Sequence, residues 1–541
     1  MFIIVQLKKT VVTTRLHTPA QHIAFLNCVH DYTFDEIENE SDPEIAFNAM
    51  YIKLNHLLDT FFPLKSVTMS ERDPHFVTPE IKILLRKRNK LMHRGHVDKA
   101  NAFTEKIRGQ IIKNNSRCMS TTIRGSKQMW EEVKRLTGKG KSNEHHFKNF
   151  TCTQLNEHYA AVSFDEGSRV LYKKSTCSQP VDFVTEFSVF RALDTLKKTP
   201  AGLDGIPHWF LRIAAPWISK PIAHLFNLSI EHSYVHATWK NSIITPVTKI
   251  SKPVKLDDFR PISVTPILSR QLEKNIIQNY IYPEIQNNTN HSKFSDQYAF
   301  RPTGSTTAAL ISMFHLISQL LLKHKFVHVI ALDFSKAFDR VRHASLADKL
   351  AALEIPDMVY NWILEYLSNR KHCTKVASQI STLLKINCSI VQGSGIGPSC
   401  YVINSSDLQP GNKDNFLKKY ADDTYLIVTP DNTNTIRSEM GQISRWALEN
   451  NLILNDSLEI VQLSLFNFGQ LPIDLKLLIR KSKHLYNLIE KKENNMLLYV
   501  LHDMIIIERD KLFAHWCTLG QNLHHPCNGD AWSIFAERLG V

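Results

Sequence analysis

The sequence predicts an α+β fold in which helices and strands follow one another without a regular βαβ repeat. Apolar residues have helical spacing at Val189, Leu193 and Leu196, and again from Pro207 to Ile230. Short β-branched runs such as SIITPVTKI lie between the helical segments, unlike the even alternation of a doubly wound sheet. A tight hairpin with two acids at its turn, KYADDTYLIV, indicates that part of the sheet is antiparallel.

Composition describes a globular chain with a basic surface. The chain has 541 residues, of which 43% are hydrophobic, so it can bury a large core in about two to four domains. Lys and Arg (65) outnumber Asp and Glu (52), which gives a net charge of +13. This balance favours a polyanionic partner such as nucleic acid, although charge alone does not define a function.

The N-terminal sequence and the scattered cysteines predict an intracellular protein. The short apolar patch from Phe2 to Val5 is followed by positive charges instead of being preceded by them, unlike a signal peptide. No apolar run approaches 18 residues, so we expect no membrane span. The nine cysteines are scattered without a C-x-x-C pair, which predicts reduced thiols in an intracellular, non-secreted protein.

Two basic helices are predicted in the N-terminal region. Thr78 is a candidate N-cap with Pro79 at the first helical position, Gly95 is a candidate end, and a second basic helix follows from about Val97. They form either a solvated helical hairpin or a surface for phosphate backbones, and both interpretations stay open.

Three segments carry the candidate chemistry. A buried strand from Phe326 to Leu332 ends in Asp333, the hairpin carries Asp422 and Asp423, and a glycine-rich stretch reads SIVQGSGIGPS. Alone, an acidic pair in a turn is usually solvated and a strand-terminal Asp usually caps a helix.

Together, the acids predict a metal site. Like charges at a hairpin tip raise each other's pKa unless a cation lies between them. Asp333, brought alongside from a neighbouring strand, would complete an oxygen-ligand cluster suited to Mg²⁺, with Mn²⁺ as a possible substitute. Two such ions serve in-line phosphoryl transfer, so the pattern predicts nucleotidyl transfer.

The motifs resemble a known family. ALDFSKAFDRV, VQGSGIGPS and KYADDTYLIV, in this order, are similar to motifs A, B and C of reverse transcriptases, specifically those of non-LTR (LINE-type, jockey-like) retrotransposons. Further similar segments are TPAGLDGIP, ITPVTKISKP, DFRPISVTPILSRQLEK and DQYAFRPTGSTTAAL. The resemblance implies a right-hand polymerase with fingers and an antiparallel palm sheet, preceded by a helical basic linker. The expected domains are a linker region (1–179), a reverse transcriptase domain (180–468, core motifs 243–465) and an atypical C-terminal tail (469–541).

The family implies roles for individual residues. Asp333, Asp422 and Asp423 would bind two catalytic metal ions, with the backbone carbonyl of Phe334 as a further ligand. Phe338 stands where the family keeps an aromatic residue that blocks a 2′-OH, which implies deoxynucleotide substrates.

Other positions would bind nucleotide or template. The resemblance places Lys249, Arg260, Gln392 and Gly393 around the incoming nucleotide, together with Phe334 and Phe338. It places Gln297, Phe300 and Arg301 against the template. Outside the motifs, each of these residues would more often be a core, ion-pair or surface residue.

The implied activity is that of an RNA-directed DNA polymerase that adds dNTPs to a primer 3′-OH on an RNA template. Its partners would be RNA template, DNA primer or target, and dNTPs, in the cytoplasm and nucleus as a ribonucleoprotein. The alternative is a catalytically inactive or domesticated nucleic-acid-binding remnant. An RNA-dependent RNA polymerase shares the acids but conflicts with an aromatic residue at Phe338.

The pattern departs from the family after Asn455. The lysine that the family places shortly afterwards is absent, since the sequence there reads Asp456, Ser457, Leu458 and Glu459. No primer-gripping hairpin or ordinary thumb is recognisable, and nothing before residue 180 resembles the family's endonuclease. We therefore expect a truncated copy with a missing or atypical thumb. Candidate zinc ligands near the C-terminus fit no common finger and are better interpreted as loop or packing residues: His515, Cys517, His524, His525 and Cys527.

Overall fold

The computed structural model describes residues 9–16, 18–70, 73, 77–120, 150–175, 184–286, 291–302, 304–377, 379–455 and 459–464. The expected tail, 469–541, lies outside this part of the chain. None of the described helices is long and apolar enough to cross a bilayer.

The chain folds into two compact units, each built from separated stretches of sequence. The first comprises the described residues of Met1–Ala160, Phe183–Ser269 and Lys371–Lys385. The second comprises those of Ala161–Asp182, Arg270–Arg370 and Ile386–Val541. This division cuts across the three consecutive domains expected from the sequence, because the chain enters each unit more than once.

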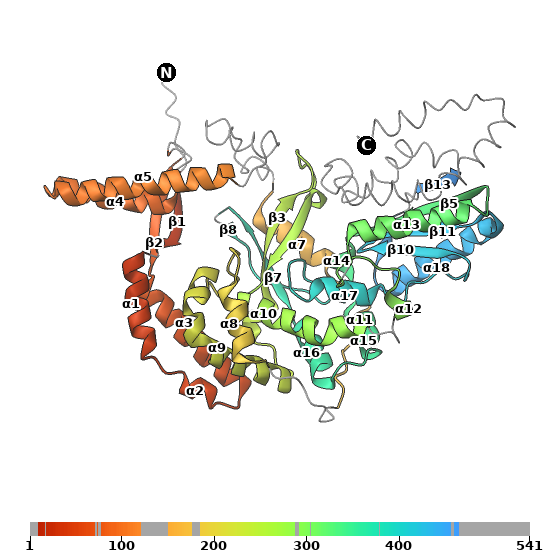
Figure 1. Ribbon diagram of the computed structural model, residues 1–541, viewed down its shortest axis with the longest axis horizontal. Helices are drawn as coiled ribbons and strands as arrows, with labels where there is room; N and C mark the ends of the chain where they lie inside the picture. Colours follow the sequence, from red (N-terminus) through yellow and green to blue (C-terminus); the bar gives the residue numbers. More distant parts are fainter. Residues whose placement is uncertain are drawn as a thin grey trace, which may run out of the picture. The chain divides into compact units, whose positions relative to one another are not determined.

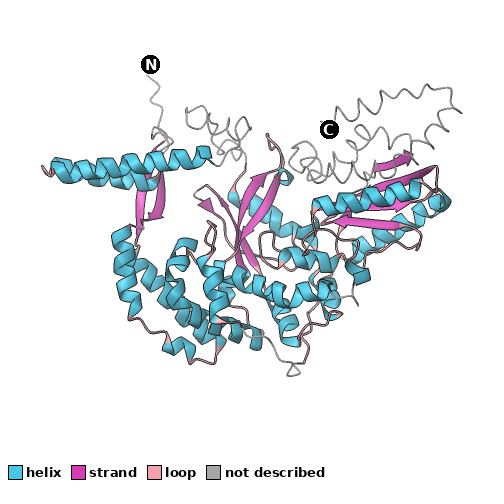
Figure 2. Ribbon diagram, viewed as in Figure 1, coloured by secondary structure: helices cyan, strands magenta, loops and turns pink. Residues whose placement is uncertain are grey.

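Besides the two basic helices described below, the first unit contains several helices (Figures 1 and 2), and aromatic rings are buried in its core. Five of these rings are at most 1% exposed: Phe25, Phe47, Phe62, Phe210 and Trp239. The helices are α1 (Pro19–His30), α2 (Asp35–Glu38), α3 (Pro43–Phe61), α7 (Cys152–Val162), whose last residues enter the second unit, α8 (Glu186–Asp194), α9 (His208–Glu231) and the 3-10 helix η2 (Ala237–Lys240). Several begin at the polar residue that their sequence predicts, as Asp42 does when its carboxylate accepts the Ile45 amide at the start of α3.

The two predicted basic helices are present as α4 (Pro79–His93) and α5 (Val97–Ser120). The Thr78 hydroxyl accepts the Ile81 amide at 3.3 Å, and Gly95 has a φ of +77° where the chain turns back. Apolar residues of both helices, including Ile81 and Ile107, are buried against each other. Beside them, β1 (Lys9–Arg15) and β2 (Leu64–Ser70) form an antiparallel pair.

The first unit also contains a sheet of five strands with the order β4-β3-β7-β8 and β9 paired to β7. The strands β3 and β4 form an antiparallel hairpin, and β3 pairs with β7 in parallel. The bounds are β3 (Asn241–Thr248), η3 (Leu256–Asp258), β4 (Phe259–Val264), β7 (Lys371–Val376), β8 (Gln379–Ile380) and β9 (Leu384–Lys385).

A four-stranded antiparallel sheet, with the order β10-β11-β5-β13, organises the second unit (Figure 2). Its strands are β5 (Phe326–Leu332), β10 (Phe416–Tyr420), β11 (Asp423–Val428) and β13 (Glu459–Ser464). The predicted strand and hairpin are therefore neighbours in one sheet. The strand β13 is not expected from the sequence, which departs from the family pattern just before it.

Both faces of the central strands β5 and β11 are buried, which explains why these two strands are largely apolar. On one face, Val327, Val329 and Ile427 pack against the helix α13 (Thr306–Leu321). On the other face, Ile330 and Leu426 are fully buried. The acids thus sit at the end of a rigid, two-sided core.

The remaining elements of the second unit surround this sheet and the glycine-rich loop. They are α10 (Ile267–Ile276), the π-helix η4 (Ile277–Ile281), α11 (Tyr282–Gln286), α12 (His291–Phe294), β6 (Phe334–Ser335), α14 (Ala337–Arg340), α15 (His343–Ala351), α16 (Asp357–Leu367), α17 (Gly397–Asn404), the 3-10 helix η5 (Pro430–Thr435), α18 (Ile436–Glu449) and β12 (Ile453–Leu454).

Candidate active site

The register of two strands brings Asp333 and Asp423 together. In the β5–β11 pair, Thr424 lies opposite Leu332, so continuing the antiparallel register by one residue sets Asp423 opposite Asp333. Residues directly opposite on antiparallel strands have Cβ atoms about 4.5 to 5.5 Å apart and face the same side. Asp422 is the next residue, in the turn that joins β10 to β11. The sheet therefore collects all three predicted carboxylates at one end.

The acids act on one another electrostatically. Burial raises the pKa of Asp423 to about 7, and the negative charges of Asp422 and Asp333 add to the effect. The neighbouring Tyr401 is 1% exposed, and its pKa is raised by burial and then by the same three acids. These three carboxylates repel one another, and a positive charge bound among them would stabilise their ionised forms.

The chemistry of these donors fits a hard cation, since Mg²⁺ prefers carboxylate oxygens. Within the described part of the chain, no group of three or more His, Cys, Asp or Glu side chains is already gathered as a metal site. The repulsion that raises the pKa of Asp423 is what a divalent ion would relieve. The two-ion site stays a prediction.

Asparagine holds the first acid in place. The Asn455 side chain donates to the Asp333 carboxylate at 2.7 Å, and its backbone amide donates to the Asp333 carbonyl at 2.9 Å. The short strand pair just before it, with Leu454 opposite Phe334, brings Asn455 to this position. In the sequence, Asn455 stands out only as the last residue that follows the family pattern, and no local pattern indicates this contact.

The turn of the hairpin has an unusual backbone. Ala421 has a φ of +57°, in the left-handed region that tight hairpin turns require. Its amide donates to Oε1 of Gln297 at 3.0 Å, and its carbonyl accepts from Nε2 of the same side chain at 3.4 Å. Gln297 is 1% exposed, so the structure shows it holding the hairpin. Its predicted contact with template stays a prediction.

A buried ion pair lies behind the hairpin. Lys419 is 1% exposed, and its ammonium group is 2.9 Å from Asp296 and donates to the Ser405 and Leu408 carbonyls, both at 2.7 Å. Burial raises the pKa of Asp296 and lowers that of Lys419, while each charge opposes the shift of the other. Of the two lysines before the acids, this one is thus a structural residue.

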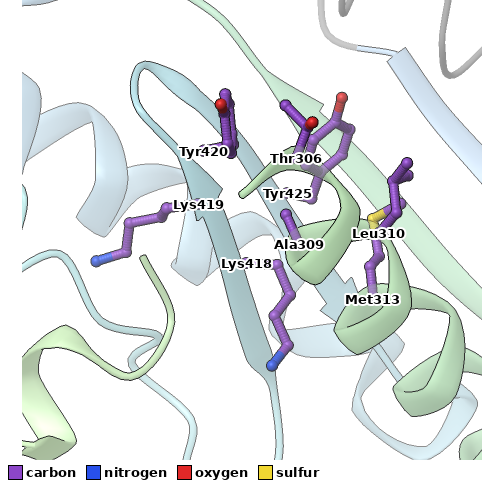
Figure 3. Close-up of a pocket in the computed structure, with 8 residues that line it drawn as sticks. All are labelled: Thr306, Ala309, Leu310, Met313, Lys418, Lys419, Tyr420 and Tyr425. Carbon is purple, nitrogen blue, oxygen red and sulfur yellow. The ribbon is translucent and has the colours of Figure 1, made fainter. Parts of the chain in front are cut away.

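The other face of the same strand borders a small pocket. Figure 3 shows Lys418 and Lys419 pointing away from each other along β10, as alternation along a strand requires. The pocket lies between α13 and the hairpin and is lined by Thr306, Ala309, Leu310, Met313, Lys418, Lys419, Tyr420 and Tyr425. It adjoins the strand that leads to the acids.

Phe338 belongs to an aromatic cluster. Its ring stacks on Tyr401, with centroids 4.5 Å apart and planes at 17°, and meets Phe300 edge to face at 6.1 Å. The negative charges of all three acids contribute to the raised pKa of Tyr401, so the aromatic cluster lies near them. The residue expected to exclude a 2′-OH is therefore held by a buried ring. The predicted metal ligand Phe334 is 3% exposed and pairs through its backbone with Leu454.

The glycine-rich loop is fixed from both sides. Gln392 donates to the Asp339 carboxylate at 2.8 Å, and Gly393 is exposed with a φ of +108° that favours glycine. Glu273, fully buried, accepts the amides of Gly395 at 2.6 Å and Ile396 at 3.1 Å. No local pattern marks Glu273 as part of the site, although it lies within the family-like segment DFRPISVTPILSRQLEK.

The predicted template residues Phe300 and Arg301 follow Gln297 in a loop. Phe300 is 41% exposed, which leaves part of its ring available to a base. Arg301 donates to the backbone carbonyls of Phe294 and Gln297, so its guanidinium stabilises the loop itself. Its predicted phosphate contact remains a prediction.

Lys249 and Arg260 lie in the first unit, on the β3–β4 hairpin. Val247 is opposite Arg260, and the Lys249 amide donates to the Asp258 carbonyl at 2.7 Å, which extends the ladder past the strand. Both side chains are exposed. Strand alternation puts them on the same face of this hairpin, as two neighbouring cations.

Comparison with known proteins identifies the part of the chain that contains this site. Residues 249–457 match the family described as reverse transcriptase (RNA-dependent DNA polymerase). The RNA-directed DNA polymerase from the Drosophila melanogaster mobile element jockey is 25% identical over 272 residues, covering 48% of this chain and 29% of that protein.

Two further Drosophila melanogaster proteins are similar. The probable RNA-directed DNA polymerase from transposon X-element is 28% identical over 246 residues (44% of this chain and 26% of the relative), and that from transposon BS is 27% identical over 242 residues (43% and 26%). The chain thus spans less than a third of the length of these relatives. Among solved structures, an apo telomerase from Candida tropicalis truncated from its C-terminal domain matches with a TM-score of 0.31 at 13% identity, over 48% of this chain and 64% of that one.

The matched range includes every residue predicted for the site, from Lys249 to Asp423. It also includes the strands that bring the acids together. The resemblance expected from the motifs is confirmed. Residues 249–457 form a reverse transcriptase domain related to those of the jockey, BS and X-element retrotransposons.

Proposed function

We propose that this chain is an RNA-directed DNA polymerase that extends a primer on an RNA template. The observation that carries the proposal is the β5–β11 register, which sets Asp423 opposite Asp333 with Asp422 in the adjoining turn. Carboxylates on neighbouring strands are suited to hold cations against a triphosphate.

In the proposed reaction, the primer 3′-OH attacks the α-phosphorus of a dNTP. A phosphodiester bond forms, the bond to the β-phosphate breaks, and pyrophosphate leaves with the electron pair, while the hydroxyl proton passes to solvent or a nearby base. Mg²⁺, held by Asp333, Asp422 and Asp423, would supply Lewis-acid activation of the hydroxyl and charge for the leaving group.

The chain's own residues prepare this chemistry. Asn455 holds Asp333, so one ligand is fixed before any substrate binds. Asp423, with a pKa of about 7, is a carboxyl group whose proton a cation would displace near neutral pH.

Selection of the sugar would come from the aromatic cluster. Phe338 is stacked on Tyr401 and cannot easily move aside for a 2′-OH, which favours dNTPs. Lys249 and Arg260 supply positive charge of the kind that binds triphosphates. The basic helices α4 and α5 would add contacts to the nucleic-acid backbone.

A primer-extension assay tests the proposal. Purified chain is given poly(rA)/oligo(dT), dTTP and Mg²⁺, and incorporation is compared for wild type, Asp422→Ala and the control Asp414→Ala. Asp414 is exposed in the loop before β10, so its loss should leave activity unchanged. We expect incorporation by wild type and the control, and a loss of at least about a thousandfold in Asp422→Ala. Retained RNA binding without incorporation by wild type would establish the inactive-remnant alternative instead.

A further inference from the structure

One buried side chain binds both polar groups of the residue before Asp422. Oε1 of Gln297 accepts the Ala421 amide at 3.0 Å, and Nε2 donates to the Ala421 carbonyl at 3.4 Å. The amide belongs to the peptide that joins Tyr420 to Ala421, and the carbonyl to the peptide that joins Ala421 to Asp422. Gln297 therefore holds the peptide groups on both sides of the left-handed turn residue.

The carboxamide of Gln297 is fully occupied. Oε1 also accepts the Ala299 amide at 3.0 Å, and Nε2 also donates to the Ser405 hydroxyl at 3.4 Å. All four bonds are buried, and the side chain is 1% exposed. Removing such a side chain would leave buried backbone groups without partners, which costs about 1 to 3 kcal/mol each.

Neighbouring residues strengthen the same contact. The Lys419 amide donates to the Asp296 carbonyl at 2.7 Å, and the Tyr298 amide donates to the Lys419 carbonyl at 2.9 Å. The segment from Asp296 to Tyr298 thus lies along β10 as an extra strand-like edge, with Gln297 bridged to Lys419. The side chain of Lys419 points away from that of Lys418 (Figure 3) and forms the buried ion pair with Asp296.

We propose that Gln297 is a positioning residue that sets the placement of Asp422 for metal binding. A left-handed alanine is costly by itself, because its Cβ crowds the backbone, and the two bonds from Gln297 offset that cost. With both flanking peptides fixed, the direction in which Asp422 leaves the turn is fixed too. The inference rests on the proposed polymerase function. It gives Gln297 a role beneath the hairpin, distinct from the expected contact with template.

Two variants separate the parts of this contact. Gln297→Met has a similar length but forms none of the hydrogen bonds. Gln297→Glu keeps the oxygen that accepts the Ala421 amide and loses the donor to the Ala421 carbonyl. The matched control is Gln319→Met, since Gln319 is exposed on α13 and bonds only to His315 among the described contacts.

The first measurement needs neither metal nor substrate. Amide hydrogen exchange of peptides covering 416–428 reports the stability of the hairpin. We expect exchange to quicken at least about tenfold in Gln297→Met, to an intermediate extent in Gln297→Glu, and not at all in Gln319→Met. Unchanged exchange in Gln297→Met would overturn the inference.

The second measurement is the steady-state rate of dTTP incorporation. A misplaced carboxylate should lower kcat by about 10- to 100-fold while KM for primer–template stays within about twofold of wild type. A raised KM for primer–template with unchanged kcat would instead show that Gln297 acts on the template and would overturn the positioning role. If wild type is inactive, the polymerase proposal fails, and hydrogen exchange still decides whether Gln297 supports the turn.

Discussion

The side-chain amide of Asn455 donates a hydrogen bond of 2.7 Å to the carboxylate of Asp333. These residues are 122 positions apart, and the short β6–β12 pair brings them together. The first of the predicted catalytic acids is therefore oriented by a residue near the end of the matched range, 249–457.

Replacing Asn455 should impair turnover more than binding. Asn455→Leu removes the donor, so Asp333 can rotate away from the other acids, and we expect kcat to fall by about 10- to 100-fold. The control Asn434→Leu alters an exposed asparagine in η5. Primer-extension kinetics decide the matter, and equal kcat values for the two variants would refute the role of Asn455.

Stability without metal should depend on pH through Asp423. Its pKa in the folded protein is raised to about 7, so between pH 4 and 7 the folded state keeps a proton that the unfolded chain has released. Stability therefore falls progressively as pH rises from about 4 to 7, and the full penalty of ionising Asp423 in the folded state is present above 7.

Thermal unfolding in EDTA tests this sign. Asp423→Asn should raise Tm relative to wild type at pH 8, by about 2 to 4 °C for each kcal/mol of relieved repulsion, and much less at pH 5. Adding Mg²⁺ should stabilise wild type at pH 8 and have a smaller effect on the variant. A Tm difference that is the same at both pH values would contradict the assignment.

Glu273 should be needed for the shape of the glycine-rich loop. In Glu273→Leu, the carboxylate oxygen that accepts both the Gly395 and the Ile396 amides is removed, and we expect a loss of about 1 to 3 kcal/mol of stability for each buried amide left without a partner. Glu354→Leu, at an exposed position, is the control. Urea denaturation at pH 7 measures the difference, and matching midpoints for the two variants would show that Glu273 is dispensable.

Phe338 should control the choice of sugar. Phe338→Ala removes the ring stacked on Tyr401 and opens space where a 2′-OH would lie. We expect the ratio of dTTP to UTP incorporation on poly(rA) to fall by at least about tenfold, a difference of about 1.4 kcal/mol. Tyr172→Ala, which removes a ring that is 79% exposed, is the control. An unchanged ratio would place the discrimination elsewhere.

The helix α4 should bind nucleic acid through its exposed cations. Arg86, Lys87 and Lys90 are exposed, whereas Lys82 is paired with Asp73. Neutralising one phosphate contact should lower the dependence of log affinity on log salt by about one. The test measures the RNA affinities of Arg86→Gln and Lys90→Gln at several salt concentrations. Lys82→Gln is the control. If all three variants keep the wild-type slope, α4 is simply a solvated helix.

The sequence predicts those parts of the fold that local patterns determine. The caps of α4, the apolar strand β5 and the acidic hairpin all appear where composition and turn residues indicate them. The pairing of the hairpin with β5 follows from the family resemblance, since periodicity alone does not specify which strands are neighbours.

The residues that hold the site in place are less predictable. Gln297, Glu273 and Asn455 act on partners more than 120 positions away. The family resemblance indicates Gln297 only as a template contact, and no local pattern marks the contacts that Glu273 and Asn455 make. The buried pair of Lys419 and Asp296 is hidden for the same reason, because a lysine before a turn is ordinarily solvated. Lys249 and Arg260 belong to the first unit and the three acids to the second, although all five lie in one continuous family-like stretch of sequence. Continuity in the sequence therefore does not define the compact units.

The strand order β10-β11-β5-β13 also has a consequence for how the protein folds. The hairpin is local in sequence, and isolated hairpins form in about 1 to 10 μs, whereas joining it to β5 closes a loop of about ninety residues. We expect the carboxylates to meet only in that slow, late step. Cations would then have no complete site to bind in early intermediates, and the ability to bind them would arise together with the finished sheet.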